Sequence, residues 1–405
     1  MKKISLALIG FYFGVLASFA QTSDQDTSTY KSRKLNVDEI NIVSSCYHQE
    51  GNSSPVTGGI GTEKLTDLET TVELKLSSLD AKNRQHTFLV EAGISHYTSA
   101  SSDKIDPSTI SSASSRDTRY FPSASYTINN EKKGIAFGVN ASYSKEFDYS
   151  SFGYGINFAK TSQDKNRELL IKLNAFQDTY TIILPIELRD PSTIISSGGG
   201  RIRYRYPTKA RNTYDASFVF TQVINMRLQI ALLCDIAYQE GFLSTPFHRE
   251  YFSNGSEGLE VLPNSHFKIP VGMRANYFLG DRIVIRTFYR YYQDDWGLRS
   301  HTINIETPIK LSPFVSLSPF YRFYVQSAVN YYGGYGQNDV LSTYHTTDDD
   351  LSKFYSNFLG LGIRFSPSAG ILGIKNFSML ELRYGFYKRS NGLVSNIVSL
   401  NLKFK

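Results

Sequence analysis

An alternation of apolar and polar positions with a period of two runs along much of the chain and is clearest in residues 266–326. There, Val271 and Met273 occupy one set of alternate positions, and Gly272 and Arg274 occupy the other. A period of two sends alternate side chains to opposite faces of a β-sheet. One face is then apolar and aromatic, whereas the other carries arginines, which have no place in a dry core. This repeat predicts a membrane-spanning β-barrel with a wet lumen.

The same alternation divides the chain into about 16 strands. The expected strands are 37–48, 67–78, 86–97, 119–128, 134–144, 151–160, 168–177, 213–224, 226–239, 267–279, 283–292, 302–310, 315–326, 354–365, 377–388 and 395–404. All the long connections are odd-numbered from the N-terminus, and the even-numbered ones are short. Bacterial outer-membrane barrels begin and end in the periplasm, with short turns there and long loops outside. The expected fold is therefore all-β: an antiparallel transmembrane β-barrel with short periplasmic turns and long extracellular loops.

The first residues have the pattern of an export signal. Lys2 and Lys3 precede an apolar run that ends in the small-residue site Ser18-Phe19-Ala20. This predicts a signal peptide at 1–20, a polar N-terminal tail at 21–36 and an outer-membrane barrel at 37–405 of a Gram-negative bacterium. An uncleaved helical anchor is the alternative, and it is disfavoured because the apolar run is short for a bilayer.

Composition agrees with a barrel. The chain has 28 Tyr and 27 Phe but one Trp, and tyrosine suits the two membrane interfaces, where an apolar ring ends in a wet hydroxyl. Beyond the leader, no apolar run is long enough to span a bilayer as a helix. The net charge of +6 is modest and gives no reason to expect a nucleic-acid partner. Two cysteines, Cys46 and Cys234, do not form a disulfide scaffold, and the sequence leaves open whether they pair.

Four segments resemble an uncharacterised exported bacterial family, domain of unknown function 3570. They are Ser54–Asp67 (SPVTGGIGTEKLTD), Thr98–Asp106 (TSASSDKID), Asn276–Leu298 (NYFLGDRIVIRTFYRYYQDDWGL) and Pro319–Val325 (PFYRFYV). The resemblance implies an outer-membrane barrel in contact with lipid and with the barrel-assembly machinery. Because genes of the family often accompany periplasmic flavin transferases and thioredoxin-like proteins, it also implies such proteins as partners. It transfers no activity to individual residues.

The chain end departs from the aromatic last residue that assists assembly in many barrels. Phe404 is penultimate and Lys405 is last.

The strongest candidate site is a set of charged side chains on the expected lumen face. Its members are Arg274, Arg286, Arg290, Glu306, Arg322, Arg364 and Arg383, with Glu381 beside the last. Because neighbouring strands lie about 4.8 Å apart, they should form one patch. Clustered guanidiniums would favour phosphates and carboxylates. The alternative is that the arginines pair with Glu306, Glu381 and Asp235 and simply fill the barrel. The wall from 134 to 157 is small and neutral inside, which leaves room for a channel or a plug.

Other motifs give weaker signals. The loop 58–64 lacks the spacing of a phosphate loop and is expected to be a tight glycine turn, folded into the mouth. The acidic run 348–350 could hold a hard cation but is expected to be solvated, as are Asp294 and Asp295. The seven histidines show no metal-ligand spacing and are expected at the surface or at the membrane interfaces. Trp296, with Tyr289, Tyr291 and Tyr292, is expected in an aromatic girdle. We expect no metal site and no cofactor.

Three functions are compatible with these patterns. The favoured one is a non-enzymatic barrel that passes or binds a small anionic solute. The second is a closed barrel that docks periplasmic redox or flavin-transfer partners. The third is an outer-membrane hydrolase built on His96 with Ser99, or on His301 with Ser300, and it is disfavoured because no third catalytic group is evident.

Overall fold

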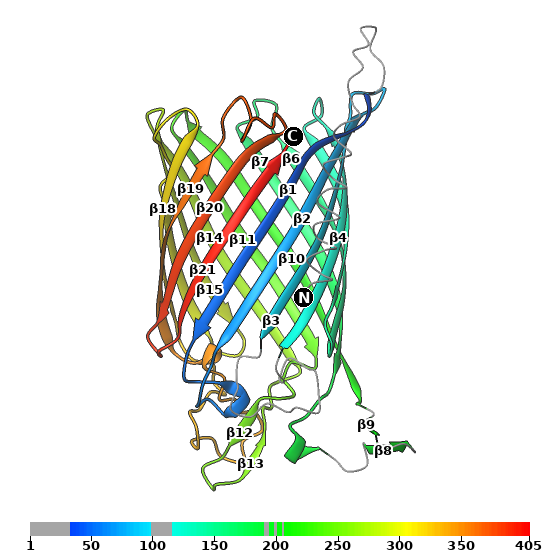
Figure 1. The fold of residues 1–405 in the computed structure, drawn as a ribbon, viewed down its shortest axis with the longest axis vertical. Helices are drawn as coiled ribbons and strands as arrows, with labels where there is room; N and C mark the ends of the chain where they lie inside the picture. Colours follow the sequence, from blue (N-terminus) through cyan, green and yellow to red (C-terminus); the bar gives the residue numbers. More distant parts are fainter. Residues whose placement is uncertain (1–32, 99–115, 190–193, 198–200, 205) are drawn as a thin grey trace.

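The computed structural model describes residues 33–98, 116–189, 194–197, 201–204 and 206–405, so the expected signal peptide and the tail as far as residue 32 lie outside it. One antiparallel sheet of 17 strands forms the wall (Figure 1). The sheet closes because β1 pairs with β2 on one side and with β21 on the other. β16 and β17 are two pieces of one wall strand, since both pair with β15 and β18. The wall is therefore a closed barrel of 16 strands, as the alternation predicts.

The wall strands follow one another around the barrel in chain order. They are β1 (Arg33–Glu50), β2 (Leu65–Leu79), β3 (Gln85–Thr98), β4 (Arg116–Asn130), β5 (Ile135–Lys145), β6 (Tyr149–Thr161), β7 (Arg167–Thr181), β10 (Thr208–Asn225), β11 (Leu228–Gly241), β14 (Ser265–Leu279), β15 (Ile283–Asp294), β16 (Arg299–Glu306), β17 (Ile309–Lys310), β18 (Val315–Gln326), β19 (Phe354–Phe365), β20 (Phe377–Arg389) and β21 (Val394–Phe404). A separate pair, β8 (Ile194–Ser197) and β9 (Arg201–Tyr204), lies in the long connection after β7.

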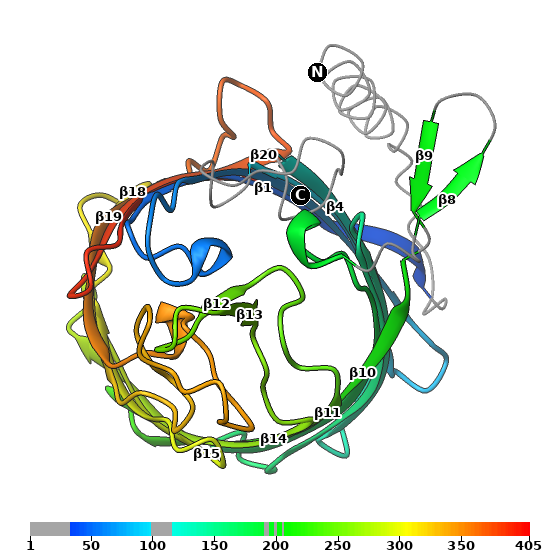
Figure 2. The same ribbon diagram turned by 90° about the horizontal axis from the view of Figure 1, so that it is seen from below.

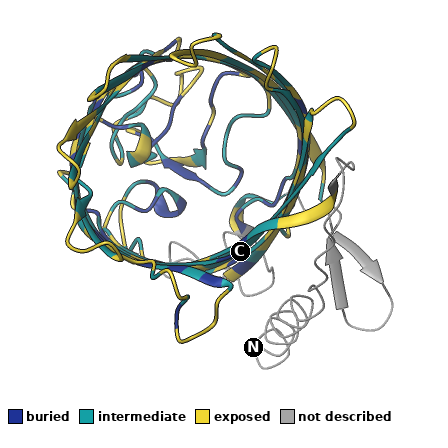
Figure 3. Cartoon of the chain, turned by 90° about the horizontal axis from the view of Figure 1, so that it is seen from above, coloured by how far each residue is buried: buried dark blue, intermediate teal, exposed yellow. Residues whose placement is uncertain are grey.

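Alternate residues place an apolar belt on the outside of the barrel. Leu359 and Ile303 are 50% and 46% exposed, because nothing in the chain covers them. A closed sheet satisfies its own backbone hydrogen bonds, so such a belt can face lipid. Exposed segments circle the wall in Figure 3. No helix in the described part of the chain has the length and apolar character needed to cross a bilayer.

Most strands are longer than the sequence-based expectation, and β10 begins five residues earlier, at Thr208 and not at residue 213. Two other boundaries have a clear local reason. β1 begins at Arg33 and not at Val37, because β2 continues to Leu79 and offers a partner for the earlier residues. Residues 33–36 therefore belong to the wall and not to the expected tail. β11 begins at Leu228 because Met226 lies in the turn, 98% exposed.

The connections sort by length between the two ends of the barrel, as predicted. Residues 51–64, 182–207, 242–264 and 327–353 leave one end, and the first residues of β1 and the C-terminus lie at the other (Figure 1). Three of these segments, 51–64, 242–264 and 327–353, fold inward. Figure 2 looks into the barrel from this end and shows them inside the ring of strands. We call these three segments the plug.

The plug has its own small framework. It contains the 3-10 helices η2 (Pro55–Thr57) and η5 (Asp349–Leu351) and the hairpin β12 (Arg249–Tyr251) with β13 (Glu257–Leu259). Backbone hydrogen bonds in both directions join Val261 to His345 and so tie the second segment to the third. Arg249 Nη1 donates to the Val56 carbonyl at 2.7 Å and ties the second segment to the first. The glycine turn at 58–64 is thus folded into the mouth, as expected.

Gly58 and Gly59 show why this turn needs glycine. Both have a positive φ, of 79° and 84°. A Cβ on Gly58 would lie 2.4 Å from the Tyr251 ring, and one on Gly59 would lie 2.8 Å from the Thr347 carbonyl oxygen. The two glycines therefore allow the first segment to pack directly on the other two.

A buried apolar cluster fastens the plug to the barrel rim. Leu262, Trp296, Leu298 and Val329 are each at most 7% exposed and pack together. The Trp296 indole donates to the Ser265 carbonyl and stacks on the His266 ring, with ring centroids 3.8 Å apart. The expectation that Trp296 joins an interfacial girdle is therefore wrong, because the plug covers it.

Candidate functional site

The arginines predicted on the lumen side lie on one continuous part of the wall. They occupy β14, β15, β18, β19 and β20, at positions that alternate with lipid-facing residues such as Met273 and Tyr321. We call Arg274, Arg286, Arg290, Arg322, Arg364 and Arg383 the arginine wall. All six therefore occupy the strand positions that the period of two assigns to the face opposite the lipid-facing residues.

Three residues of the arginine wall, Arg286, Arg364 and Arg383, form ion pairs with two glutamates. Arg383 contacts both Glu306, at 2.9 Å, and Glu381, at 3.1 Å. Arg364 contacts Glu381 at 2.7 Å, and Arg286 lies 3.7 Å from Glu306. For these three arginines, the alternative reading in which the charges pair and fill the barrel is correct. Asp235, the third carboxylate named in that reading, makes no ion pair within the described residues.

The other half of the arginine wall has no such partner. Within the described part of the chain, no ion pair joins Arg274, Arg290 or Arg322 to a carboxylate. Arg322 instead lies over the Phe358 ring, 5.9 Å from its centroid. Guanidiniums stay charged at any physiological pH, so these three present uncompensated positive charge to the lumen.

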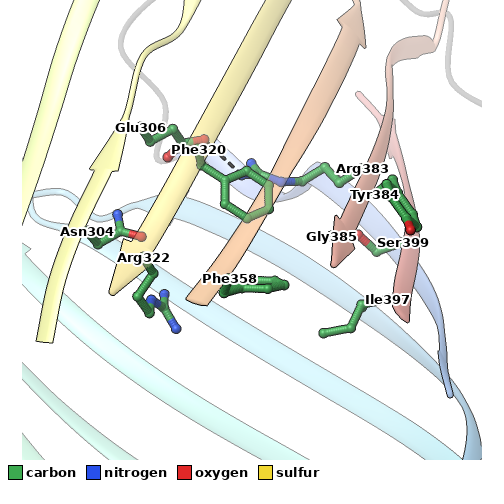
Figure 4. Close-up of a pocket in the computed structure, with 10 residues that line it drawn as sticks. All are labelled: Asn304, Glu306, Phe320, Arg322, Phe358, Arg383, Tyr384, Gly385, Ile397 and Ser399. Carbon is green, nitrogen blue, oxygen red and sulfur yellow. Dashed lines mark hydrogen bonds and ion pairs between the residues drawn. The ribbon is translucent and has the colours of Figure 1, made fainter. Parts of the chain in front are cut away.

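A pocket of about 190 Å³ lies where the two halves meet. Figure 4 shows Arg322 and Asn304 on one side of it and the Arg383–Glu306 pair on the other, with Phe320 and Phe358 nearby. To reach Glu306, Arg383 extends past β18 and β19. Glycine at 362 makes this possible, because a Cβ there would lie 3.2 Å from the Arg383 Cγ.

Opposite the arginines, the lumen face carries glutamates that the sequence reading did not single out. Glu69 and Glu73 lie on β2 and Glu91 on β3, and within the described residues none of them forms an ion pair. In the circuit of 16 strands, β2 and β3 stand half-way round from β14 and β15. The lumen therefore has a basic side and an acidic side. The alternation predicts that these glutamates share the lumen face with the arginines. The order of the strands around the barrel is needed to see that the glutamates and the arginines face each other.

Between these sides, the wall is small and neutral, as predicted. Gly138, Asn140, Ser142, Gly153 and Gly155 share the lumen face of β5 and β6. Asn140 donates to Asn174 at 3.4 Å across this face. The lumen face of β5 and β6 therefore leaves more free space than the strands that carry arginines or glutamates.

The acidic run 348–350 is part of the plug, so the expectation of a solvated loop is wrong for Asp348 and Asp349, whereas Asp350 is exposed. Asp348 accepts the backbone N–H of Asp350, Asp349 accepts the hydroxyl of Tyr332, and Asp350 pairs with Arg389 on β20. Asp294 was also expected in solvent but is 9% exposed, since it binds His266, Tyr292 and the N–H of Leu298.

Three histidines are buried, against the expectation that all seven lie at the surface or at the membrane interfaces. His248, His266 and His345 are between 6% and 9% exposed. Each faces a carboxylate, at 3.5 Å for His248 and Glu260, 3.0 Å for His266 and Asp294, and 3.9 Å for His345 and Glu250. In each pair the histidine and its carboxylate lie at least 12 positions apart in the sequence. A search for closely spaced histidines and carboxylates therefore could not predict these contacts.

Of the two serine–histidine pairs considered for a hydrolase, the structure describes both members only of Ser300 with His301, and it does not bring these two side chains together. Ser300 is buried on the lumen side, whereas His301 bonds the hydroxyl of Tyr289 on the lipid side. His96 bonds Thr118, and Ser99 lies outside the described residues. Cys46 and Cys234 are free thiols and do not pair with each other.

Glu63, at the edge of the plug, makes the plug sensitive to pH. Burial, together with the charges of Asp350 and Asp348, raises the pKa of Glu63 to about 7, although Arg389 opposes the shift. A raised carboxyl pKa means that the folded plug holds the proton more tightly than the unfolded segment, so stability falls as pH rises from about 4.5 to 7. Burial lowers the pKa of His248, but Glu260 and Asp348 outweigh it and leave that pKa raised, which acts in the same direction.

We expect amide exchange in residues 51–64 to be faster, after correction for intrinsic rates, at pH 8 than at pH 5.5. Glu63→Gln should reduce this difference because the amide cannot ionise, and any remainder would report other ionisable groups of the plug. Equal pH dependence in wild type and Glu63→Gln would contradict the assignment.

Comparison with known proteins gives one family and several distant barrels. A family model described as a protein of unknown function (DUF3570) matches residues 29–393. No curated protein matches the chain. A mutant of the ferric enterobactin receptor PfeA from Pseudomonas aeruginosa is 12% identical with a TM-score of 0.46, over 86% of this chain and 53% of the receptor. A BenF-like porin from Pseudomonas fluorescens Pf-5 is 10% identical with a TM-score of 0.41, over 91% and 98%. The chain spans about half the length of the receptor.

Proposed function

This chain belongs to the DUF3570 family of proteins of unknown function, and we propose that it is an outer-membrane barrel that passes or binds a small anionic solute. The observation that carries the proposal is the set of lumen arginines without a carboxylate partner, Arg274, Arg290 and Arg322. The apolar belt supports a membrane location, and the expected export signal supports the outer membrane.

Physical chemistry favours an anion at this part of the lumen. Three fixed positive charges on a curved wall raise the local concentration of anions. A guanidinium binds a carboxylate or phosphate through two parallel hydrogen bonds, which selects planar or tetrahedral oxyanions over halides. The pocket of about 190 Å³ beside Arg322 is of a size for a small organic anion.

The plug decides how such a solute reaches the arginine wall. It occupies the long-loop end, while the short-turn end carries no comparable segment among the described residues. In our proposal the solute binds from the short-turn side, and passage through the barrel requires the plug to move.

Ion selectivity in planar bilayers tests the proposal. We expect the purified barrel to prefer anions, and Arg290→Gln with Arg322→Gln to reduce the preference at least twofold, because two uncompensated charges are lost. Arg282→Gln is the control for Arg290→Gln alone, since each removes one positive charge from the same hairpin and Arg282 lies in its exposed turn. Unchanged selectivity in the double variant would remove the arginine wall from the mechanism.

The same recordings separate the two main candidates. A barrel that never conducts and that captures a specific periplasmic redox or flavin-transfer protein would favour the docking function over solute passage. Binding of a small carboxylate measured by calorimetry would keep the anion site even in a barrel that does not conduct.

A further inference from the structure

Within the plug, three potential metal ligands from two segments converge on one point. His248 precedes β12 directly and Glu260 follows β13 directly, so the hairpin brings them together, and the Glu260 N–H donates to the His248 carbonyl. Asp348 arrives from the third segment, which the paired hydrogen bonds between Val261 and His345 hold in place. One ligand atom from each of the three residues lies within 4.8 Å of the others.

The separations do not fit ordinary hydrogen bonds. His248 Nδ1 lies 3.5 Å from Glu260 Oε1 and 3.8 Å from Asp348 Oδ2, whereas a hydrogen bond from nitrogen to oxygen spans about 2.7–3.2 Å. Two donors at bond lengths of about 2.0–2.2 Å from a tetrahedral ion stand about 3.4 Å apart. The measured gaps are close to this ligand spacing.

His248 provides an independent sign of a missing partner. The residue is 9% exposed, and its Nδ1 is buried and makes no hydrogen bond within the described part of the chain. A buried polar atom without a partner is costly, and it often marks an ion or a water at the site. This atom points between the two carboxylates.

The carboxylates are held by a second layer of hydrogen bonds. Thr346, which is fully buried, donates its hydroxyl to Glu260 Oε1 at 2.6 Å and accepts the N–H of Asp348 at 3.0 Å. The Thr245 N–H donates to Glu260 Oε2, and the Asp350 N–H fixes Asp348 Oδ1, which turns Oδ2 toward His248. Ligands oriented in this way are typical of protein metal sites.

We propose that His248, Glu260 and Asp348 bind one first-row transition-metal ion of the zinc type, which clasps the second and third plug segments together. One imidazole with two carboxylates suits such an ion, whereas calcium prefers six to eight oxygens. Three protein ligands leave a fourth position for water. Because the ion binds only the assembled plug, it adds its binding energy to plug stability.

Zinc titration of the full-length barrel tests this proposal independently of any anion site. The protein is purified in detergent, stripped with a chelator and carries Cys46→Ser and Cys234→Ser, so that no thiol competes for zinc. Calorimetry should show one Zn²⁺ per chain, and His248→Ala or Asp348→Asn should weaken binding at least tenfold. His266→Gln is the control, since it removes a buried rim histidine that faces Asp294 and not this site.

Two further readouts guard against a misassembled plug. Heat-modifiability on gels reports barrel closure in every variant. Zn²⁺ should slow proteolysis within 242–264 in the parent protein but not in Asp348→Asn. Asparagine has the size of aspartate, so this variant should keep the packing of the plug. X-ray absorption should show nitrogen and oxygen ligands near 2.0–2.2 Å. Absence of stoichiometric binding in the parent, or equal affinity in His248→Ala, would overturn the proposal and leave a protonated His248 paired with the carboxylates.

Discussion

Replacing residues 245–261 by a short Gly-Ser linker will raise the single-channel conductance of the barrel several-fold. The deleted residues carry the β12–β13 hairpin and Arg249, which together hold the three plug segments inside the mouth. Barrels of 16 strands are wide enough for an aqueous channel once the lumen is clear. The measurement is the distribution of conductance steps in planar bilayers, compared with that of the intact chain.

The matched control shortens the connection 366–376 at the other end. Ile371 of that connection packs on Ile40 and Phe404, whose side chains lie on the outer face of β1 and β21, so the connection covers the outside of the wall. Its removal should leave conductance unchanged. A plug deletion that conducts like the intact barrel would show that the plug does not limit the pore.

Arg249→Ala will loosen the whole plug. The Arg249 side chain is 6% exposed, and its guanidinium joins Glu187, Glu257 and the Val56 carbonyl. Breaking a buried ion pair by removal of one partner costs about 3–5 kcal/mol. Glu187 is 37% exposed and can be solvated, so we take the lower end, about 3 kcal/mol. Amide exchange in 51–64 and 242–264 should then rise on the order of 100-fold.

Arg84→Ala supplies the comparison. Arg84 also forms a close ion pair, with Asp80 at 2.7 Å, but in an exposed turn. Such pairs contribute about 0–1 kcal/mol, so this variant should leave plug exchange unchanged. A similar rise in both variants would mean that Arg249 has no special role in joining the segments.

The strands of the wall could be predicted from the sequence because one local rule, the alternation of side chains along a strand, determines which face each residue occupies. Membership of a face depends only on whether a residue occupies an odd or even position, and this rule placed Arg290 and Arg322 in the lumen and Met273 toward lipid. It also gave the sorting of long and short connections. It could not say that Arg383 reaches past two strands to Glu306, because that contact depends on the space left by Gly362.

The structure of the plug could largely not be predicted from the sequence, because no local rule determines its contacts. Its contacts join loops without periodicity, and the hydrogen bond between Thr346 and Glu260 connects residues 86 positions apart. Buried loop residues such as Trp296 and His248 therefore looked like surface residues. The glycine turn was the exception, since consecutive glycines in one loop signal close packing even when the partner is unknown.

The two charged sides of the lumen have a consequence for molecular orientation. Between Glu73 and Glu91 on one side and Arg274 and Arg290 on the other, the electric field runs across the barrel, perpendicular to its axis. A zwitterion entering this field would gain energy by turning its ammonium toward the glutamates and its carboxylate toward the arginines. The barrel would thus discriminate between isomers of equal net charge by the separation of their charged ends.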